Sequence, residues 1–370
     1  MQSPSLRELS RSRTNNFDFL RFLMACIVIY THSFRISGAL YSSGKQRLLH
    51  GDFGGATLAV DVFFLISGFL ISSSFQNSAT TLHYLQKRLL RIYPGFIAAL
   101  AFCVFIVGPL AGVDRHTYFT SRGTYAFFLP ILWAPLQVLP GAFSAAHWES
   151  AVNSSLWTIR FELFCYFLPP LLGLFGLFRP RGVILALFIA AICAHNLEAH
   201  QLPFQWKMFL PWFGDVWELP RFMMYFLAGM TYFAWRDHIR LTLPALALAS
   251  AGALIGFATP LKDILLPLAL PYLIFYIAFS PRIPFQRFGK HGDFSYGMYL
   301  YAFPIQQLLV RYLPLDHKPF VLTFLAGIAT FAAAFLSWRL IEKPCLQLKN
   351  RGHAAHPSAH EPAPIPAATT

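Results

Sequence analysis

Arg21 and His32 lie eleven residues apart in one strongly apolar segment, FDFLRFLMACIVIYTHSF. In a helix, their side chains would be separated by about 16 Å along the axis, roughly half of a ~30 Å hydrocarbon core, and would project from similar sides. An imidazole inside a membrane is costly to bury and titrates near neutral pH, which indicates a functional role. We therefore expect His32 to take part in function and not only in packing.

Two carboxylates are candidate catalytic partners of His32. Asp61 lies in the apolar run GGATLAVDVFFLISGFLIS, and antiparallel packing of the first two apolar segments would bring it to the depth of His32. A carboxylate near an imidazole stabilises the imidazolium that forms on protonation. Glu162, in SSLWTIRFELFCYF, could complete the same polar cluster. The alternatives are a structural buried pair joining two helices, and polar residues that face a wet cavity.

Arg88 and Arg91 are three residues apart in YLQKRLLRIYPGF and would share one face of a helix. Two guanidinium groups at this spacing suit a ligand that carries phosphates, because each can donate paired hydrogen bonds. Arg88 and Arg91 are therefore candidates for binding a phosphate-bearing ligand. The alternative is that they are topology determinants or contact lipid headgroups.

Five further residues are predicted to line a substrate channel. Small residues permit close approach of a ligand, and hydroxyl groups can bind one, but close helix packing and a membrane-interface position are alternatives for the same residues. The predicted channel residues are Ser67, Gly68, Trp157, Tyr296 and Tyr299.

The composition indicates an all-α polytopic integral membrane protein. Of 370 residues, 56% are hydrophobic and 12% are charged, which is far from the composition of a soluble domain. The formal net charge of +13 resides largely between apolar segments, so we expect topology determinants and no nucleic-acid partner. About ten transmembrane helices are predicted, at 17–34, 56–75, 92–111, 156–178, 179–195, 221–235, 243–260, 264–280, 295–312 and 320–338.

Alternate connections between these segments are rich in Lys and Arg, so the positive-inside rule places both termini in the cytoplasm. The apolar stretch 125–140 contains three prolines and is interpreted as re-entrant or interfacial. Three regions follow: a cytoplasmic segment over 1–16, a transmembrane domain over 17–345, and a disordered cytoplasmic tail over 346–370. The five cysteines show no paired spacing, and no metal is expected.

Taken in order, these segments resemble the acyltransferase 3 family of integral membrane acyltransferases. The resemblance rests on Arg21-x10-His32, Gly54-Gly55-x12-Gly68, Arg88-x2-Arg91, SLWTIRFE with Glu162, FSYGMYLYAFP, and Ile341-Glu342-Lys343-Pro344. Each motif alone is weak, but together they extend over nearly all of the membrane portion.

The resemblance implies transfer of an acyl group, commonly acetyl, from cytoplasmic acyl-coenzyme A to a hydroxyl of an extracytoplasmic carbohydrate or glycolipid. It also implies a multi-pass protein of a bacterial inner membrane, in contact with membrane lipid. By this resemblance His32 would be the catalytic histidine, as a general base or a transient acyl carrier, with Asp61 as its partner. Arg21, Arg88 and Arg91 would be the donor-binding residues. Two departures from the family pattern are Ala302, where many relatives carry a histidine, and the lack of a fused hydrolase-like (SGNH-type) domain.

Two other classes of protein fit part of this pattern. A proton-coupled secondary transporter or flippase for a cell-envelope metabolite would use the His, Asp and Glu residues as a proton relay. It predicts two related halves, which the sequence does not show, and it leaves the paired arginines unexplained. A non-catalytic membrane receptor or scaffold would tolerate replacement of His32.

Overall fold

The computed structural model describes residues 4–12, 14–39, 54–112, 114–129, 138–143, 151–199 and 218–348. In these ranges the fold is all-helical, and an isolated β-bridge joins Ser5 to Arg240. Parts of the connections between the predicted segments, at 40–53, 144–150 and 200–217, the middle of the stretch 125–140, and most of the tail lie outside the described residues.

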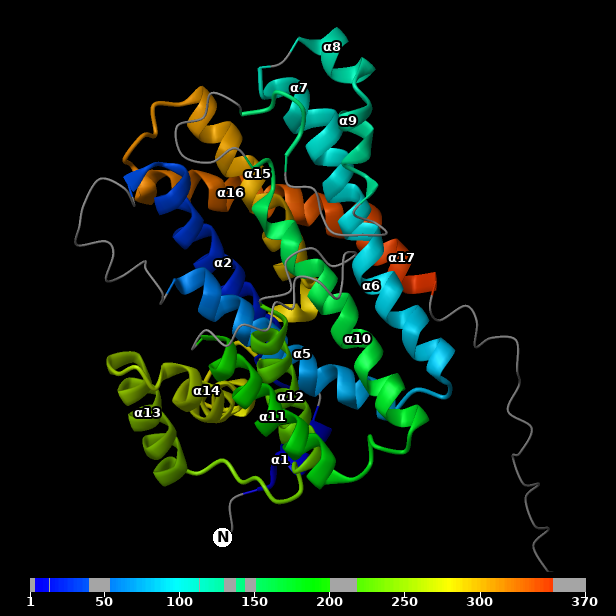
Figure 1. The fold of residues 1–370 in the computed structure, drawn as a ribbon, viewed down its shortest axis with the longest axis vertical. Helices are drawn as coiled ribbons and strands as arrows, with labels where there is room; N and C mark the ends of the chain where they lie inside the picture. The colour runs from blue at the N-terminus through cyan, green and yellow to red at the C-terminus, as the bar shows by residue number, and fades with distance from the viewer. Residues whose placement is uncertain are drawn as a thin grey trace, which may run out of the picture.

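Each of the ten predicted apolar segments coincides with a long helix (Figure 1). These helices are α2 (Phe17–Ile36), α5 (Gly55–Gln76), α6 (Thr81–Phe102), α10 (Ile159–Leu174), α11 (Arg181–Ala199), α12 (Leu219–Ala234), α13 (Leu243–Ala258), α14 (Lys262–Phe279), α15 (Ser295–Tyr312) and α16 (Pro319–Ser337). The shorter elements are α1 (Leu6–Arg11), η1 (Cys103–Val107), α7 (Gly108–Leu110), α8 (Arg115–Thr120), α9 (Arg122–Ala126), η3 (Ser154–Thr158), η5 (Phe288–His291), η6 (Trp338–Glu342) and α17 (Lys343–Leu348).

Helix α6 begins eleven residues earlier than hydropathy predicted. The side chain of Thr80 accepts a hydrogen bond from the backbone amide of His83 at 3.1 Å and so caps the helix, whereas the prediction started at the first apolar residues. Arg88 and Arg91 therefore lie on the helix itself and not in a connection. Their shared face is directed into the helical bundle, as described below.

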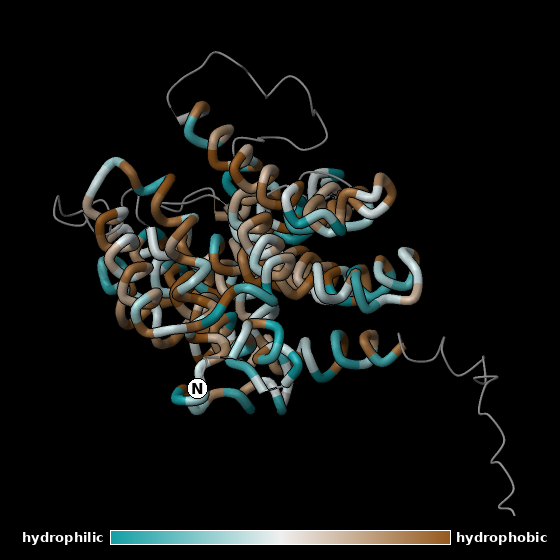
Figure 2. Tube along the Cα trace, turned by 90° about the horizontal axis from the view of Figure 1, so that it is seen from below, coloured by the Kyte–Doolittle hydropathy of each residue, from teal (hydrophilic) through white to brown (hydrophobic). Residues whose placement is uncertain are grey.

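Five helical stretches in the described chain are long and apolar enough to cross a membrane: Phe17–Ile36, Gly55–Gln76, Thr81–Leu110, Lys262–Phe279 and Pro319–Leu348. Helices Arg181–Leu197 and Leu243–Ala258 are apolar but shorter. Figure 2 shows apolar residues dominating the helices. The protein is thus an integral membrane protein, while ten spans and the orientation of the termini remain predictions.

Helices α2 and α5 form an antiparallel pair, as predicted. Near one end, a Cβ added to Gly55 would lie 2.8 Å from the hydroxyl of Thr31, and near the other end the rings of Phe17 and Phe69 are 6.0 Å apart. This pairing places His32, late in α2, at the end of the pair where α5 begins. Arg21 lies toward the opposite end.

A second close contact joins α5 to α12 through two glycines. A Cβ on Gly68 would lie 2.0 Å from the carbonyl oxygen of Phe226, and a Cβ on Gly229 would lie 2.1 Å from that of Leu65. The backbones approach so closely that no side chain fits between them. The channel prediction for Gly68 is therefore corrected, because this residue is buried in a helix contact.

Helix α15 runs through the interior and is tied to its neighbours by buried amide side chains. The Gln306 amide donates to the carbonyl of Ile29 and to the hydroxyl of Ser33, both at 2.7 Å, which joins α15 to α2. The Asn153 amide donates to the carbonyl of Leu300 at 2.9 Å, which joins the segment before η3 to α15. In an apolar bundle such bonds fix the helix register, because leaving them unmade is costly.

The glycine contact predicts that Gly68→Ala destabilises the protein. The added methyl group must displace backbone, so we expect a loss of about 1–3 kcal/mol or more and a clearly lower melting temperature in detergent. Gly327→Ala is the matched control, since nothing lies within 4 Å of its added Cβ and alanine favours helix. Equal melting temperatures for the two variants would contradict the proposed packing.

Candidate active site

One cavity, about 390 Å³ in volume, collects the predicted donor-binding arginines, and we call it the arginine cavity. Arg21 reaches it from α2, Arg88 and Arg91 from α6, and Ser67 from α5. Glu162 and Tyr296 also line it. The structure therefore brings together, around one space, residues from five helices.

Asp293 organises the positive charges of this cavity. Its carboxylate contacts Arg21 Nη1 at 3.2 Å and Arg91 Nη2 at 2.5 Å, and it accepts a hydrogen bond from the amide of Ser295 at 3.2 Å. Burial alone would raise the pKa of Asp293, but the two guanidinium groups and the bonds from Ser295 outweigh it and lower the pKa to about 2. Asp293 is thus a fixed anion that holds two arginines in place.

The two arginines of α6 are held differently. Arg91 is paired with Asp293, lies 3.9 Å from Glu342, and stands over the ring of Tyr296 at 5.7 Å. Arg88 donates to the hydroxyl of Ser74 at 3.1 Å, and it makes no ion pair within the described residues. Arg88 is therefore the arginine of the pair whose charge is available to an anionic ligand.

Glu162 does not join His32, contrary to the predicted cluster. Its side chain lines the arginine cavity and accepts a hydrogen bond from the hydroxyl of Tyr166 at 2.6 Å. The prediction relied on depth in the membrane alone, and depth does not fix which side of the helix faces which cavity. Glu162 consequently belongs with the residues of the arginine cavity.

A second cavity, about 290 Å³ in volume, is lined by His32, and we call it the histidine cavity. Trp157 of η3 and Arg221 of α12 also line it, together with Glu218. The His32 ring packs edge-on against Phe303 of α15, with centroids 5.2 Å apart. Its Nδ1 is buried and has no hydrogen-bond partner among the residues that the structure describes.

Asp61 is paired with an arginine and not with the imidazole. Its carboxylate lies 2.9 Å from Nη2 of Arg221, and Arg221 in turn contacts Glu218 at 2.9 Å and donates to the carbonyl of Thr57 at 3.0 Å. The predicted direct Asp61–His32 contact is thus absent from the described part of the chain. Asp61 acts on the histidine cavity through Arg221, whose position it fixes.

Arg221 and Asp293 are the residues that sequence reasoning missed. Arg221 is the first residue of a predicted membrane segment, and an arginine at that position was a detectable sign of a buried ion pair. Asp293 immediately precedes the FSYGMYLYAFP block and carried no comparable sign, because its role depends on two arginines far away in sequence.

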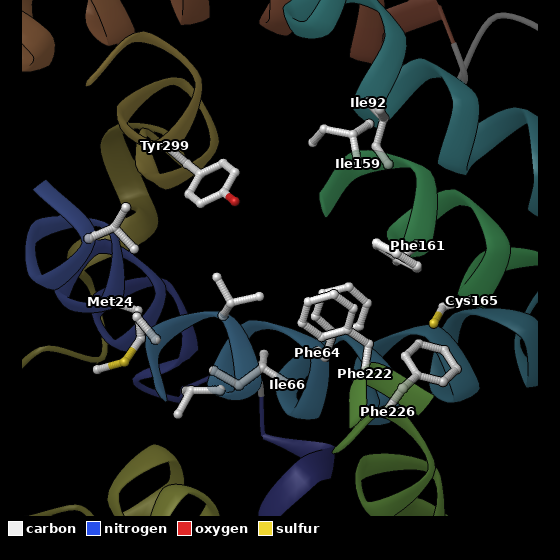
Figure 3. Close-up of a cluster of buried hydrophobic side chains, with 14 of the residues drawn as sticks. Met24, Phe64, Ile66, Ile92, Ile159, Phe161, Cys165, Phe222, Phe226 and Tyr299 are labelled. Atoms are coloured by element: carbon white, nitrogen blue, oxygen red, sulfur yellow. The ribbon is translucent and has the colours of Figure 1, made fainter. Parts of the chain in front are cut away.

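The two cavities share part of their lining. Val60 of α5 and Tyr299 of α15 border both. The hydroxyl of Tyr299 is hydrogen-bonded to that of Thr158 at 2.8 Å, and Figure 3 shows the Tyr299 ring projecting away from α15 into the centre of the bundle. We call Val60, Tyr299 and Thr158 the partition, since they stand between the arginine cavity and the histidine cavity.

The four channel predictions that remain are divided between the two spaces. Ser67 and Tyr296 line the arginine cavity, Trp157 lines the histidine cavity, and Tyr299 lines both. Among the described residues, no three His, Cys, Asp or Glu side chains are grouped as metal ligands. The arrangement is suited to bringing an anionic ligand on one side toward an imidazole on the other.

Comparisons with known proteins agree on one family. A family model described as an acyltransferase domain matches residues 14–339. The chain is 26% identical to an "O-acetyl transferase" of Shigella phage Sf6, over 90% of this chain and 96% of the phage protein. It is 27% identical to "Nodulation protein 10" of Rhizobium leguminosarum bv. viciae, over 92% and 96% of the two chains.

A third relative is the "Exopolysaccharide production protein ExoZ" of Rhizobium meliloti, 27% identical over 86% of this chain and 97% of that protein. No solved structure matches the chain.

The Asp293 network predicts a stability change that depends on pH. Asp293→Asn leaves two guanidinium groups without their shared anion, and breaking a buried pair costs about 3–5 kcal/mol, so we expect a melting temperature lowered by several degrees at pH 7. Because the folded-state pKa of Asp293 is depressed, its stabilisation is complete above about pH 4 and is lost as the pH falls toward 2. The deficit of the variant should therefore shrink over that window.

Asp18→Asn is the control for this variant. Asp18 also pairs with Arg21, at 2.5 Å, but its side chain is 39% exposed and it does not contact Arg91. We expect a much smaller loss of stability. Similar losses for the two variants would refute the central position of Asp293.

Proposed function

The chain belongs to the acyltransferase 3 family, and on that premise we propose that this enzyme transfers an acyl group from acyl-coenzyme A to a hydroxyl of a carbohydrate or glycolipid. The names of two relatives support the chemistry: one is an O-acetyl transferase and another a protein of exopolysaccharide production. Acetyl is therefore the acyl group that we propose first, with an extracytoplasmic polysaccharide or glycolipid as acceptor.

The observation that carries this proposal is the division of the site into two cavities that meet at the partition. One cavity offers arginines, and the other offers an imidazole with an unoccupied nitrogen. Acyl-coenzyme A carries phosphates at one end and a thioester at the other. It therefore needs a site that binds phosphates and, at a distance from it, a group that acts on the thioester. A transferase also needs a separate space for its acceptor.

We assign the arginine cavity to the donor. Arg88 contacts the phosphates of acyl-coenzyme A, while Arg21 and Arg91 are positioned by Asp293 and contribute to the positive field. Leu346, close to the end of the described chain, lines the same cavity. Since the positive-inside rule places that end in the cytoplasm, we propose that the donor cavity opens to the cytoplasm.

His32 carries the chemistry in the second cavity. As a general base it removes the proton of the acceptor hydroxyl, whose oxygen attacks the thioester carbonyl; the carbon–sulfur bond breaks, the acyl–oxygen bond forms, and the proton passes to the coenzyme A thiolate. Alternatively, His32 accepts the acyl group itself before passing it on. In both routes Arg221, fixed by Asp61, lies in the same cavity to stabilise negative charge.

The predicted membrane topology determines from which side the acceptor enters. We propose ten spans with both termini in the cytoplasm of a bacterium, and the inner membrane as the location. The acceptor then meets His32 from the extracytoplasmic side, where Trp157 offers an aromatic face for a sugar ring.

Replacement of His32 tests its role. His32→Ala should lower the turnover of radiolabelled acetyl-coenzyme A, measured with purified protein in nanodiscs, by about two to four orders of magnitude. Binding of acetyl-coenzyme A should be retained, because the phosphates lie in the other cavity. His195→Ala is the matched control: this histidine is also on a membrane helix, 3.6 Å from Asp263, and lines neither cavity. Full turnover in His32→Ala would exclude the assignment.

Replacement of Arg88 tests the donor cavity. Hydrogen bonds to charged groups contribute about 1.5–3 kcal/mol, so Arg88→Ala should raise the Kd for acetyl-coenzyme A by about tenfold or more. The exposed Arg339, which lines neither cavity, provides the control Arg339→Ala with unchanged Kd. If both variants bind acetyl-coenzyme A as the wild type does, the phosphates are held elsewhere.

A further inference from the structure

We propose that the partition, and Val60 above all, determines the length of the acyl group that the enzyme accepts. This inference rests on the proposed function, since it takes the arginine cavity as the donor site. It adds a specificity determinant that neither the family nor the relatives' names supply.

The partition lies where the two cavities meet. Val60 and Tyr299 are the residues that border both cavities, and both are nearly buried, with exposed fractions of 8% each. A donor whose phosphates are held near Arg88 presents its thioester sulfur from the arginine cavity. The acyl chain, on the far side of the carbonyl, therefore points at Val60 and Tyr299.

The residues of the partition are held in place by their neighbours. The Tyr299 hydroxyl is bonded to Thr158 at 2.8 Å, and its ring packs edge-on against Phe63 with centroids 5.9 Å apart. On the opposite side, Val60 is branched at Cβ and sits on α5, which the glycine contact holds against α12. Neither Tyr299 nor Val60 can move aside without breaking these contacts. The partition therefore does not accommodate additional carbon atoms on the acyl group.

Two consecutive residues of η3 face different cavities. Trp157 faces the histidine cavity, whereas the next residue, Thr158, faces the arginine cavity and bonds to Tyr299. The hydrogen bond therefore fixes Tyr299 at the boundary where the donor space and the acceptor space meet. A short acyl group reaches this boundary, while a longer one collides with it.

Val60→Ala tests the inference directly. The substitution removes two carbon atoms, the number by which butyryl exceeds acetyl. Each methylene in an apolar pocket is discriminated about tenfold or more, so the ratio of Kd values for butyryl- and acetyl-coenzyme A should fall by at least about tenfold, measured by calorimetry on the full chain in nanodiscs. The matched control is Val62→Ala on the same helix, a buried valine that lines neither cavity, for which the ratio should stay unchanged.

Two further variants keep the test decisive if Val60→Ala does not fold. Val60→Leu narrows the boundary and should weaken propionyl-coenzyme A binding relative to acetyl-coenzyme A. Tyr299→Phe keeps the ring but removes the bond to Thr158, so it should lower the butyryl-to-acetyl ratio of Kd values. Unchanged ratios in the folded partition variants, with tight acetyl-coenzyme A binding, would overturn the inference alone. A wild-type protein that binds no acyl-coenzyme A would instead overturn the proposed function.

Discussion

Charged side chains inside a membrane protein need partners, and this constraint determines the form of the site. Asp61 and Arg221 satisfy each other at 2.9 Å, and Asp293 satisfies Arg21 and Arg91 together. Each pair joins helices that are distant in sequence, since an unpaired charge in this setting would cost far more than the pair. The same pairs that permit the charges to be buried therefore also fix the walls of the two cavities.

Two groups that lack such a partner within the described residues are those to which we assign chemistry. Arg88 makes no ion pair within the described chain, and Nδ1 of His32 has no hydrogen-bond partner there. Both groups also line a cavity, so a ligand that enters these spaces can reach them. One is suited to a phosphate and the other to a proton or an acyl group, and the partition of Val60, Tyr299 and Thr158 stands between them.

Sequence reasoning was accurate where the information was local. Apolar runs predicted the ten long helices, and the predicted antiparallel packing of the first two apolar segments is present in α2 and α5. It was wrong where a partner came from far along the chain: Asp61 pairs with Arg221, and Glu162 belongs to the arginine cavity. Gly68 shows the same limit, because only the position of Phe226 reveals that the glycine serves helix packing.

The most direct test of this account is a cryo-electron microscopy structure of the protein with a non-hydrolysable thioether analogue of acetyl-coenzyme A. The account predicts phosphate density beside Arg88 in the arginine cavity, with the acetyl group against Val60 and Tyr299 and directed toward His32. Density for the analogue in the histidine cavity, or at a site remote from both, would contradict the division into donor and acceptor spaces.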